Sequence, residues 1–197
     1  MWFKPGGRAM LFTATERFAC DQVAFRWRAR FPLVPLLALN VTDQYARGFG
    51  ELAVRALHLP LQRQTGRDVA IAEAYRYLAE LIWVPDAILA NRELEWRAVD
   101  ARRVEVSTEA AGERVKMMLV FGLDGEIERC CADARPRLVN GRSIPTPWGG
   151  AVSDYRSLGA RRMPTRAEVY WDLPEGRFVY WEATVTSAEA LAEPFAP

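Results

Sequence analysis

The residues best suited to acid–base chemistry lie in one stretch, "DVAIAEAYRYLAELIW" (68–83), where charged residues recur at helical spacing. In a helix that turns about 100° per residue, Glu73, Arg76 and Glu80 fall within one narrow wedge of the circumference. Arg76 and Glu80 are four residues apart, so the simplest interpretation is an ordinary surface ion pair. The alternative is that the wedge faces a cavity, where Glu80 acts as an acid or base with a raised pKa and Arg76 orients it.

The sequence gives little support for a nucleophilic catalytic site or a metal site. His58 is the single histidine, which excludes a multi-histidine metal site, and a Ser-His-Asp triad would lack the G-x-S-x-G motif. Cys20, Cys130 and Cys131 have no C-x-x-C spacing and predict free thiols. "GFGELA" (48–53) matches a dinucleotide-binding fingerprint loosely, but without a βαβ frame its glycines more simply ease a bend or bulge between strands. We therefore expect no metal and no cofactor.

A second group of candidate residues combines arginine with large aromatic side chains. Between residues 129 and 166 there are eight arginines against two acids, so this segment carries +6 while the rest of the chain carries −5. Two stretches within it, "IPTPWGG" and "DYRSLGARRMP", mix prolines with Trp148, Tyr155 and Arg156 in what we expect to be loops. Such loops form binding rims, where arginines contact a carboxylate, phosphate or lipid headgroup. The same composition equally fits a surface region without a ligand, or loops that plug an open barrel end.

Most of the chain alternates apolar and polar residues, which predicts β-strands. The stretch 22–31, "QVAFRWRARF", places its apolar side chains, Trp27 among them, on one face and three arginines on the other. Residues 135–164 are rich in proline and glycine and predict a looser, loop-rich region. Short turns between successive strands predict an antiparallel meander. The other predicted strands are 93–99 around Trp96, 103–108, 114–121 and 126–132, and the turn signal Leu123-Asp124-Gly125 joins the last two as a hairpin. A second hairpin, 168–181, carries Trp171 and Tyr180.

Residues 68–83 break the alternation and predict a helix of about four turns, with Asp68 as its N-cap and Pro85 just beyond its end. This helix is apolar over more than half of its circumference, so it must be covered on several sides. A short second helix is expected at 86–91. The predicted fold class is α+β, a strongly curved antiparallel sheet (a half-barrel) that wraps one long central helix and a short second helix in a single domain, 1–197.

Composition restricts the class of protein. Half of the 197 residues are hydrophobic and 26% are charged, as in folded globular proteins. A net charge of +1 argues against a nucleic-acid partner. The N-terminus lacks the apolar core of a signal peptide, and the longest apolar run, "FPLVPLLAL", is too short to cross a bilayer. We therefore expect no transmembrane segment and a cytoplasmic location for the chain as written, with a membrane-associated or periplasmic location if an N-terminal segment is missing. The oligomeric state is left open.

Several motifs together resemble an uncharacterised bacterial family, a domain of unknown function of the DUF6544/DUF6920 type. Nearly the whole chain takes part, but its start departs from many members, which carry extra N-terminal sequence. The motifs are "DQYARGFGEL" (43–52), "RYLAELIWVPDAIL" (76–89), "TPWGG" (146–150), "DYRSLGARRMP" (154–164) and "EVYWDLPEGRFVYW" (168–181). The family has no assigned activity. Its architecture is similar to the half-barrel of the lipoprotein carriers (LolA/LolB-like), in which a curved sheet wraps helices around an apolar cavity, although fold similarity does not transfer function.

The favoured hypothesis is noncatalytic binding of a lipid or another hydrophobic molecule, including an anionic one, in the concave face of the sheet. One alternative is an enzyme acting on a small hydrophobic substrate, with Glu80 as the acid or base. The other is a structural or partner-binding module whose cavity is filled by its own side chains. The candidate ligand-binding residues are Arg76, Glu80, Trp27, Trp96, Trp148, Tyr155, Arg156, Trp171 and Tyr180.

Overall fold

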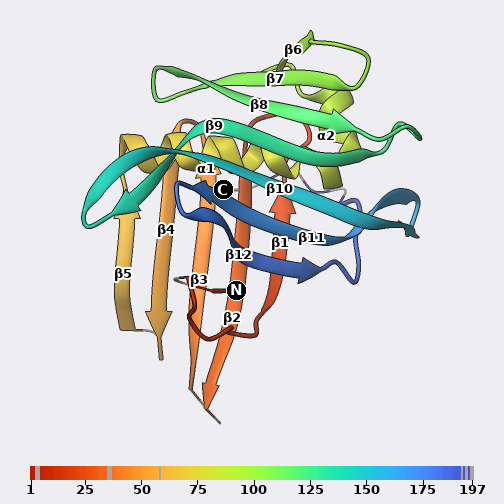
Figure 1. The fold of residues 1–197 in the computed structure, drawn as a ribbon. Coiled ribbons are helices and arrows are strands. Elements are labelled where there is room, and N and C mark those ends of the chain that lie inside the picture. The colour runs from red at the N-terminus through yellow and green to blue at the C-terminus, as the bar shows by residue number, and fades with distance from the viewer. Residues whose placement is uncertain (3–4, 35–36, 58, 192, 194, 196–197) are drawn as a thin grey trace.

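The computed structural model describes residues 1–2, 5–34, 37–57, 59–191, 193 and 195, and His58 lies outside them. Two antiparallel sheets pack around a helix (Figure 1). Sheet A contains β1 (Thr13–Phe18), β2 (Phe25–Val34), β3 (Leu37–Ala46), β4 (Phe49–Ala56) and β5 (Leu59–Thr65). Sheet B contains β6 (Glu95–Ala98), β7 (Arg103–Ala110), β8 (Glu113–Phe121), β9 (Ile127–Val139), β10 (Arg142–Leu158), β11 (Arg161–Leu173) and β12 (Gly176–Thr184). Strands adjacent in sequence are adjacent in each sheet, which confirms the antiparallel meander.

Helix α1 (Arg67–Glu80) connects the two sheets and lies between them. It crosses the strands of sheet A near one end, with β7 to β10 of sheet B on its other side (Figure 1). A 3-10 turn, η1 (Leu81–Trp83), and the short helix α2 (Pro85–Ala90) follow it. The second helix is therefore confirmed within one residue.

Two parts of the predicted fold class are wrong. The helix is covered by two open sheets rather than by one half-barrel, and with 14 residues α1 is not one long central helix. The predicted N-cap is also wrong, because Gly66 occupies that position with φ 111° and Asp68 lies in the first turn. An antiparallel α+β fold with a helix covered on both sides is what remains of the prediction.

Residues 135–164 are not loops, because the long strands β9, β10 and β11 run through them. Proline lacks a backbone N–H, so strands tolerate it where one side has no partner or at a bulge. Pro136 and Pro145 face each other where the β9–β10 hairpin extends beyond its pairing with β8 and β11. Pro147 lies at the bulge between Thr146 and Trp148. These prolines therefore lie where strands extend beyond their neighbours or form a bulge. Composition alone does not distinguish such strand positions from loops.

The glycines of "GFGELA" serve the β3–β4 hairpin and its contact with α1. Arg47 and Gly48, with φ of 52° and 78°, form the turn. At Gly50 a Cβ atom would lie 2.8 Å from the Ala70 Cα, so a larger residue would separate β4 from the helix. The bend interpretation is right in outline, and the antiparallel hairpin gives no dinucleotide-binding frame.

A bulge in the β11–β12 hairpin turns two neighbouring aromatic residues toward the interior. The register shifts so that Tyr170 is opposite Val179 while Val169 is opposite Trp181, which leaves Tyr180 as the extra residue. Tyr180 stacks on Trp171 at 6.0 Å, and Trp181 contacts Phe12 of the N-terminal segment at 6.1 Å. In a regular strand Tyr180 and Trp181 would lie on opposite faces, but the bulge places both on the same face.

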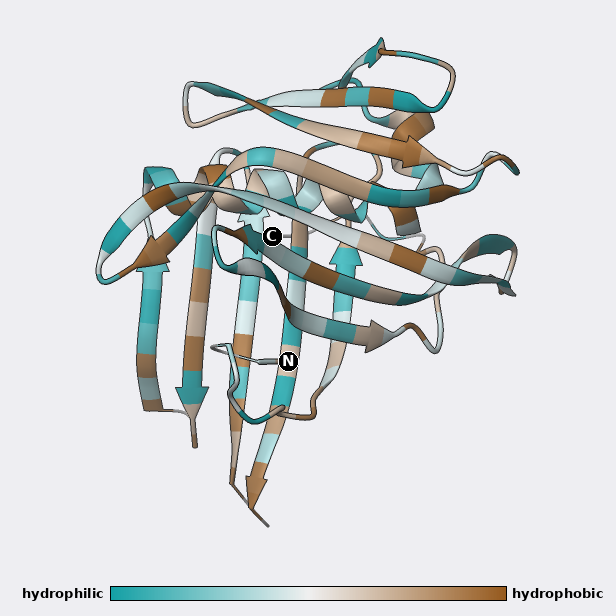
Figure 2. Cartoon of the chain, in the orientation of Figure 1, coloured by the Kyte–Doolittle hydropathy of each residue, from teal (hydrophilic) through white to brown (hydrophobic). Residues whose placement is uncertain are grey.

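Hydropathy along the ribbon follows the two-sheet arrangement (Figure 2). Hydrophobic and hydrophilic residues alternate along most strands, while the free ends of the strands of sheet A, remote from the helix, carry several hydrophobic residues. The core is formed by the inward faces of both sheets and by α1, and its largest fully buried side chains include Tyr77, Phe25, Phe31 and Leu78. The space inside the sheets is thus occupied largely by the protein's own side chains.

Candidate functional site

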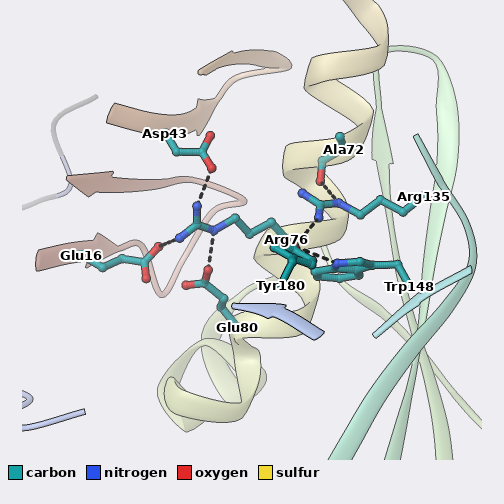
Figure 3. A network of polar contacts seen from close by, with 8 residues as sticks. All are labelled: Glu16, Asp43, Ala72, Arg76, Glu80, Arg135, Trp148 and Tyr180. Atoms are coloured by element: carbon teal, nitrogen blue, oxygen red, sulfur yellow. Dashed lines mark hydrogen bonds and ion pairs between the residues drawn. The ribbon is translucent and has the colours of Figure 1, made fainter. Parts of the chain in front are cut away.

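The charged wedge of α1 faces sheet A and forms an ion-pair network around Arg76. The Arg76 guanidinium donates to Glu80 one turn along the helix at 2.5 Å, to Asp43 on β3, and to Glu16 on β1 at 3.4 Å (Figure 3). The same group lies over the rings of Phe25 and Trp27, at 4.9 and 5.0 Å from their centroids. Only 16% of the Arg76 side chain is exposed. The predicted Arg76–Glu80 pair exists, but it belongs to a largely buried network that joins one helix to two strands.

This network contains more carboxyl groups than arginines, and burial favours the protonated form of two of them, Glu16 and Glu73. Burial raises the pKa of Glu73 well above its usual value, and the neighbouring Asp43 carboxylate raises it further. Among the described residues, Asp43 Oδ1 and Glu73 Oε2 are both buried without a hydrogen-bond partner. A proton retained on Glu73 gives these two facing carboxyl groups a hydrogen bond. Burial, with Glu80 nearby, also raises the pKa of Glu16.

On the sheet B side of α1, Arg135 of β9 forms a second centre. Its Nε donates to the Ala72 carbonyl oxygen at 3.1 Å, and its Nη1 donates to the Tyr180 hydroxyl at 3.4 Å (Figure 3). Trp148 Nε1 donates to the same hydroxyl at 3.0 Å. The guanidinium also lies 4.2 Å from the centroid of Trp148 and 5.6 Å from that of Trp171. Arg135 is thus held by aromatic rings and neutral acceptors.

Arg137, two residues further along β9, brings a second guanidinium to the same aromatic group. It lies 5.7 Å from the centroid of Trp171. Phe178 flanks Tyr180 at 6.4 Å on β12. Arg135 and Trp148 are buried, whereas Arg137, Trp171, Phe178 and Tyr180 are partly exposed, so the group has a buried base and an open rim. We call these six residues the arginine–aromatic cluster.

Several arginines near this cluster are paired with carboxylates. Arg156, Arg161 and Arg162 pair with Asp154, Asp86 and Glu126. Among the residues that the structure describes, neither Arg135 nor Arg137 has a carboxylate within ion-pair distance. Arg135 does interact with the buried Glu73 carboxyl group, but burial raises the pKa of Glu73 well above its usual value, which favours the neutral form. The cluster is therefore a positively charged, aromatic-walled surface.

The remaining predicted site residues lie outside both centres. Trp96 is 38% exposed on the edge strand β6. The Tyr155 hydroxyl donates to the Ile127 carbonyl oxygen at 2.8 Å, and burial raises its pKa to about 12. Arg156 is exposed and pairs with Asp154 on its own strand. These three residues serve local contacts and do not converge on a common point.

The described surface has hollows of about 490 and 290 Å³. The larger is lined mainly by charged residues, including Arg47, Arg92 and Glu93, and the smaller lies beside the start of α1 near Arg67 and Tyr75. None of the nine predicted ligand-binding residues lines either hollow. Within the described part of the chain, no group of three histidine, cysteine or acidic residues is arranged to hold a metal, and no helix is both long and apolar enough to cross a membrane.

Sequence reasoning thus identified six of the residues that form the two centres and missed the residues that connect them. Arg76, Glu80 and Trp27 meet on one side of α1, and Trp148, Trp171 and Tyr180 meet on the other. Glu16, Asp43 and Arg135 were not predicted. Arg135 and Arg137 are two residues apart, a spacing that places both side chains on the same face of a strand. This signal could have been used only if the proline-rich segment had been predicted to form a strand.

Comparison with known proteins gives a family without an activity. A family model described as a family of unknown function (DUF6544) matches residues 1–183. No curated protein and no solved structure matches the chain. The likeness to lipoprotein carriers therefore stays a prediction.

Proposed function

The chain belongs to the DUF6544 family of unknown function, and from its geometry we propose that it is a noncatalytic binding protein for an amphipathic anion, such as a fatty acid or an anionic lipid. The observation that carries this proposal is the arginine–aromatic cluster, where two guanidinium groups flank Trp171 without a carboxylate partner among the described residues. Burying a cation without a counter-charge is unfavourable, and a bound anion removes that cost.

The chemistry of the cluster matches both ends of such a ligand. A planar guanidinium binds a carboxylate or phosphate through two parallel hydrogen bonds, and Arg137 is the more accessible of the pair. The partly exposed rings of Trp171, Phe178 and Tyr180 provide an apolar wall for a hydrocarbon chain. The ligand would lie along the rim of sheet B, because α1 and the core side chains occupy the space between the sheets.

The other hypotheses fit this geometry less well. Glu80 accepts a hydrogen bond from Arg76 within a largely buried ion-pair network, which leaves it less accessible to a substrate than the open rim of the arginine–aromatic cluster. A purely structural module accounts for the filled interior, but it gives no reason for two arginines beside open aromatic rings that have no carboxylate partner in the described part of the chain.

Tryptophan fluorescence during titration with oleate tests the proposal, with oleyl alcohol as the uncharged ligand of the same chain length. We expect oleate to bind and to change the emission of Trp148 and Trp171. Oleyl alcohol should bind at least about tenfold more weakly, because its neutral hydroxyl cannot form the bidentate ion pair of a carboxylate with a guanidinium. Arg137→Gln should reduce oleate affinity by about tenfold or more, since its guanidinium has no other hydrogen bond in the described structure.

Arg177→Gln is the matched control. Arg177 also lies over an aromatic ring, at 3.6 Å from the centroid of Tyr170, but it is paired with Asp172 on the opposite face of the same hairpin. Its substitution should leave oleate affinity unchanged. Equal losses in the two variants, or equal affinities for oleate and oleyl alcohol, would show that the cluster does not recognise an anion.

A further inference from the structure

The face of sheet A that points away from α1 is strongly basic. Along β2, Phe25 and Trp27 point toward the helix, so the alternate arginines point to the other side. Residues directly opposite across an antiparallel ladder share a face, and the register extends this surface over all five strands. It carries Arg17, Arg26, Arg28, Arg30, Arg55 and Arg63, and within the described strands its acid is Glu51. We call this surface the basic face.

Several arginines of the basic face have no carboxylate partner among the described residues. Two others do: Arg63 pairs with Glu51 at 2.8 Å, and Arg17 lies 3.8 Å from Glu193. In the part of the chain that the structure describes, Arg28, Arg30 and Arg55 have no carboxylate within ion-pair distance, and all three are exposed. The basic face therefore has charge available for a partner, although the protein as a whole carries a net charge of only +1.

The free end of the same sheet is apolar. The hairpins β2–β3 and β4–β5 end side by side, because β3 pairs with β4 and Leu39 lies opposite Ala56 (Figure 1). Exposure of the apolar side chains at these two ends ranges from 43% to 67%. We call these residues the apolar tip: Leu33, Val34, Leu57, Leu59 and Leu61. Hydrophobic colouring at the free strand ends marks this region in Figure 2.

We propose that the apolar tip and the basic face together dock the protein on the surface of an anionic lipid bilayer. Leucine and valine side chains at the hairpin ends enter the boundary between headgroups and acyl chains, and the arginines bind lipid phosphates. Arg55 is two residues from Leu57, and Arg30 is three from Leu33, which at about 3.3 Å per residue places the guanidinium-bearing positions roughly 7 to 10 Å above the tip. That spacing matches the depth of about 5 to 10 Å to which peripheral apolar faces enter a membrane.

Charge and apolar exposure together favour a bilayer over a nucleic acid. The phosphates of either partner would attract the arginines, but a nucleic acid backbone offers nothing to five exposed aliphatic side chains. This surface lies on sheet A and is separate from the arginine–aromatic cluster of sheet B, so membrane docking and ligand binding stand or fall independently.

Cosedimentation with lipid vesicles tests the proposal. We expect the full chain to bind vesicles of phosphatidylcholine mixed with phosphatidylglycerol and not vesicles of phosphatidylcholine alone, with binding weakened by salt. Each substitution Arg30→Gln or Arg55→Gln should lower the partition coefficient about fivefold. The double substitution Leu57→Ser with Leu59→Ser should lower it about tenfold or more, because it removes apolar area from the membrane.

Matched controls come from sheet B, where Arg129→Gln and Leu123→Ser change an exposed arginine and a 93% exposed leucine. These variants should bind vesicles as the wild type does. All substituted residues are exposed or partly exposed, and unchanged melting temperatures establish that each variant is folded. Three results would overturn the proposal: no wild-type binding to the phosphatidylglycerol vesicles, equal losses in the sheet B controls, or duplex oligonucleotide binding that depends on the arginines but not on the leucines.

Discussion

Replacing Glu73 with glutamine should make the protein less sensitive to rising pH. Glu73 is 6% exposed on the helix face that meets Asp43, and burial followed by the nearby Asp43 charge raises its pKa well above the usual 4.5, with Arg135 and Arg76 opposing the shift. The folded state therefore holds a proton on Glu73 that the unfolded chain releases above about pH 4.5. Glutamine is neutral at every pH, and its amide N–H can donate to Asp43 in place of that proton.

The sign and size of the effect follow from proton linkage. A carboxyl group whose folded pKa is raised contributes stability that is fully present below the unfolded pKa and is lost as pH rises toward the folded pKa. Between those two values the wild type should lose up to about 1.4 kcal/mol of unfolding free energy per pH unit relative to Glu73→Gln. Glu16, whose pKa is also raised, acts in the same direction in both proteins, so the comparison isolates Glu73.

Urea unfolding at a series of pH values from about 4.5 to 8 measures this difference. We expect the free energies of unfolding of wild type and Glu73→Gln to diverge as pH rises, with the variant relatively more stable at the upper end. Glu175→Gln, at an exposed position in the β11–β12 turn, serves as the control and should follow the wild type. Parallel pH profiles for wild type and Glu73→Gln would mean that Glu73 is ionised in the folded protein, which would refute the protonated-pair interpretation.

Two further predictions concern the core. Tyr77→Phe removes a buried hydroxyl that donates a hydrogen bond to the Ala19 carbonyl oxygen and accepts one from Asn91. It should lower the free energy of unfolding, measured by urea titration, by about 1 to 3 kcal/mol. An unchanged unfolding midpoint would contradict these hydrogen bonds. Burial raises the pKa of the Cys130 thiol to about 12. At about pH 8 a disulfide reagent should therefore modify the exposed Cys131 in the folded protein, and Cys130 only after unfolding. Rapid modification of Cys130 in the folded protein would show that β9 is not packed as described.

Much of the secondary structure could be predicted because it depends on residues close in sequence. Period-two alternation located β2, β6, β7 and β8, and the turn at Asp124–Gly125 correctly joined β8 to β9. The free cysteines also agree with the spacing argument among the described residues. The failures at 135–164 arose because a proline is compatible with a strand wherever its missing N–H has no partner, and that condition depends on where the neighbouring strands end.

The candidate sites were harder to predict because their contacts join distant parts of the chain. Periodicity grouped Arg76 with Glu80, but Asp43 is 33 residues away and Glu16 is 60 residues away. Arg135 reaches the Ala72 carbonyl across 63 residues, and its position beside Trp148 and Trp171 depends on the register of three strands. Strand register is set by the packing of whole faces, so a local pattern does not reveal it.

The sequence by itself determined that the chain forms antiparallel strands around an apolar helix, because hydrophobic burial at periods of two and 3.6 residues is a local property. The tertiary structure alone decided that there are two sheets, that the helix separates an ion-pair network from an arginine–aromatic cluster, and that a bulge turns both Tyr180 and Trp181 inward. These outcomes depend on which distant strands pair and on how charges share a dry interior, and neither is encoded within any single stretch of the chain.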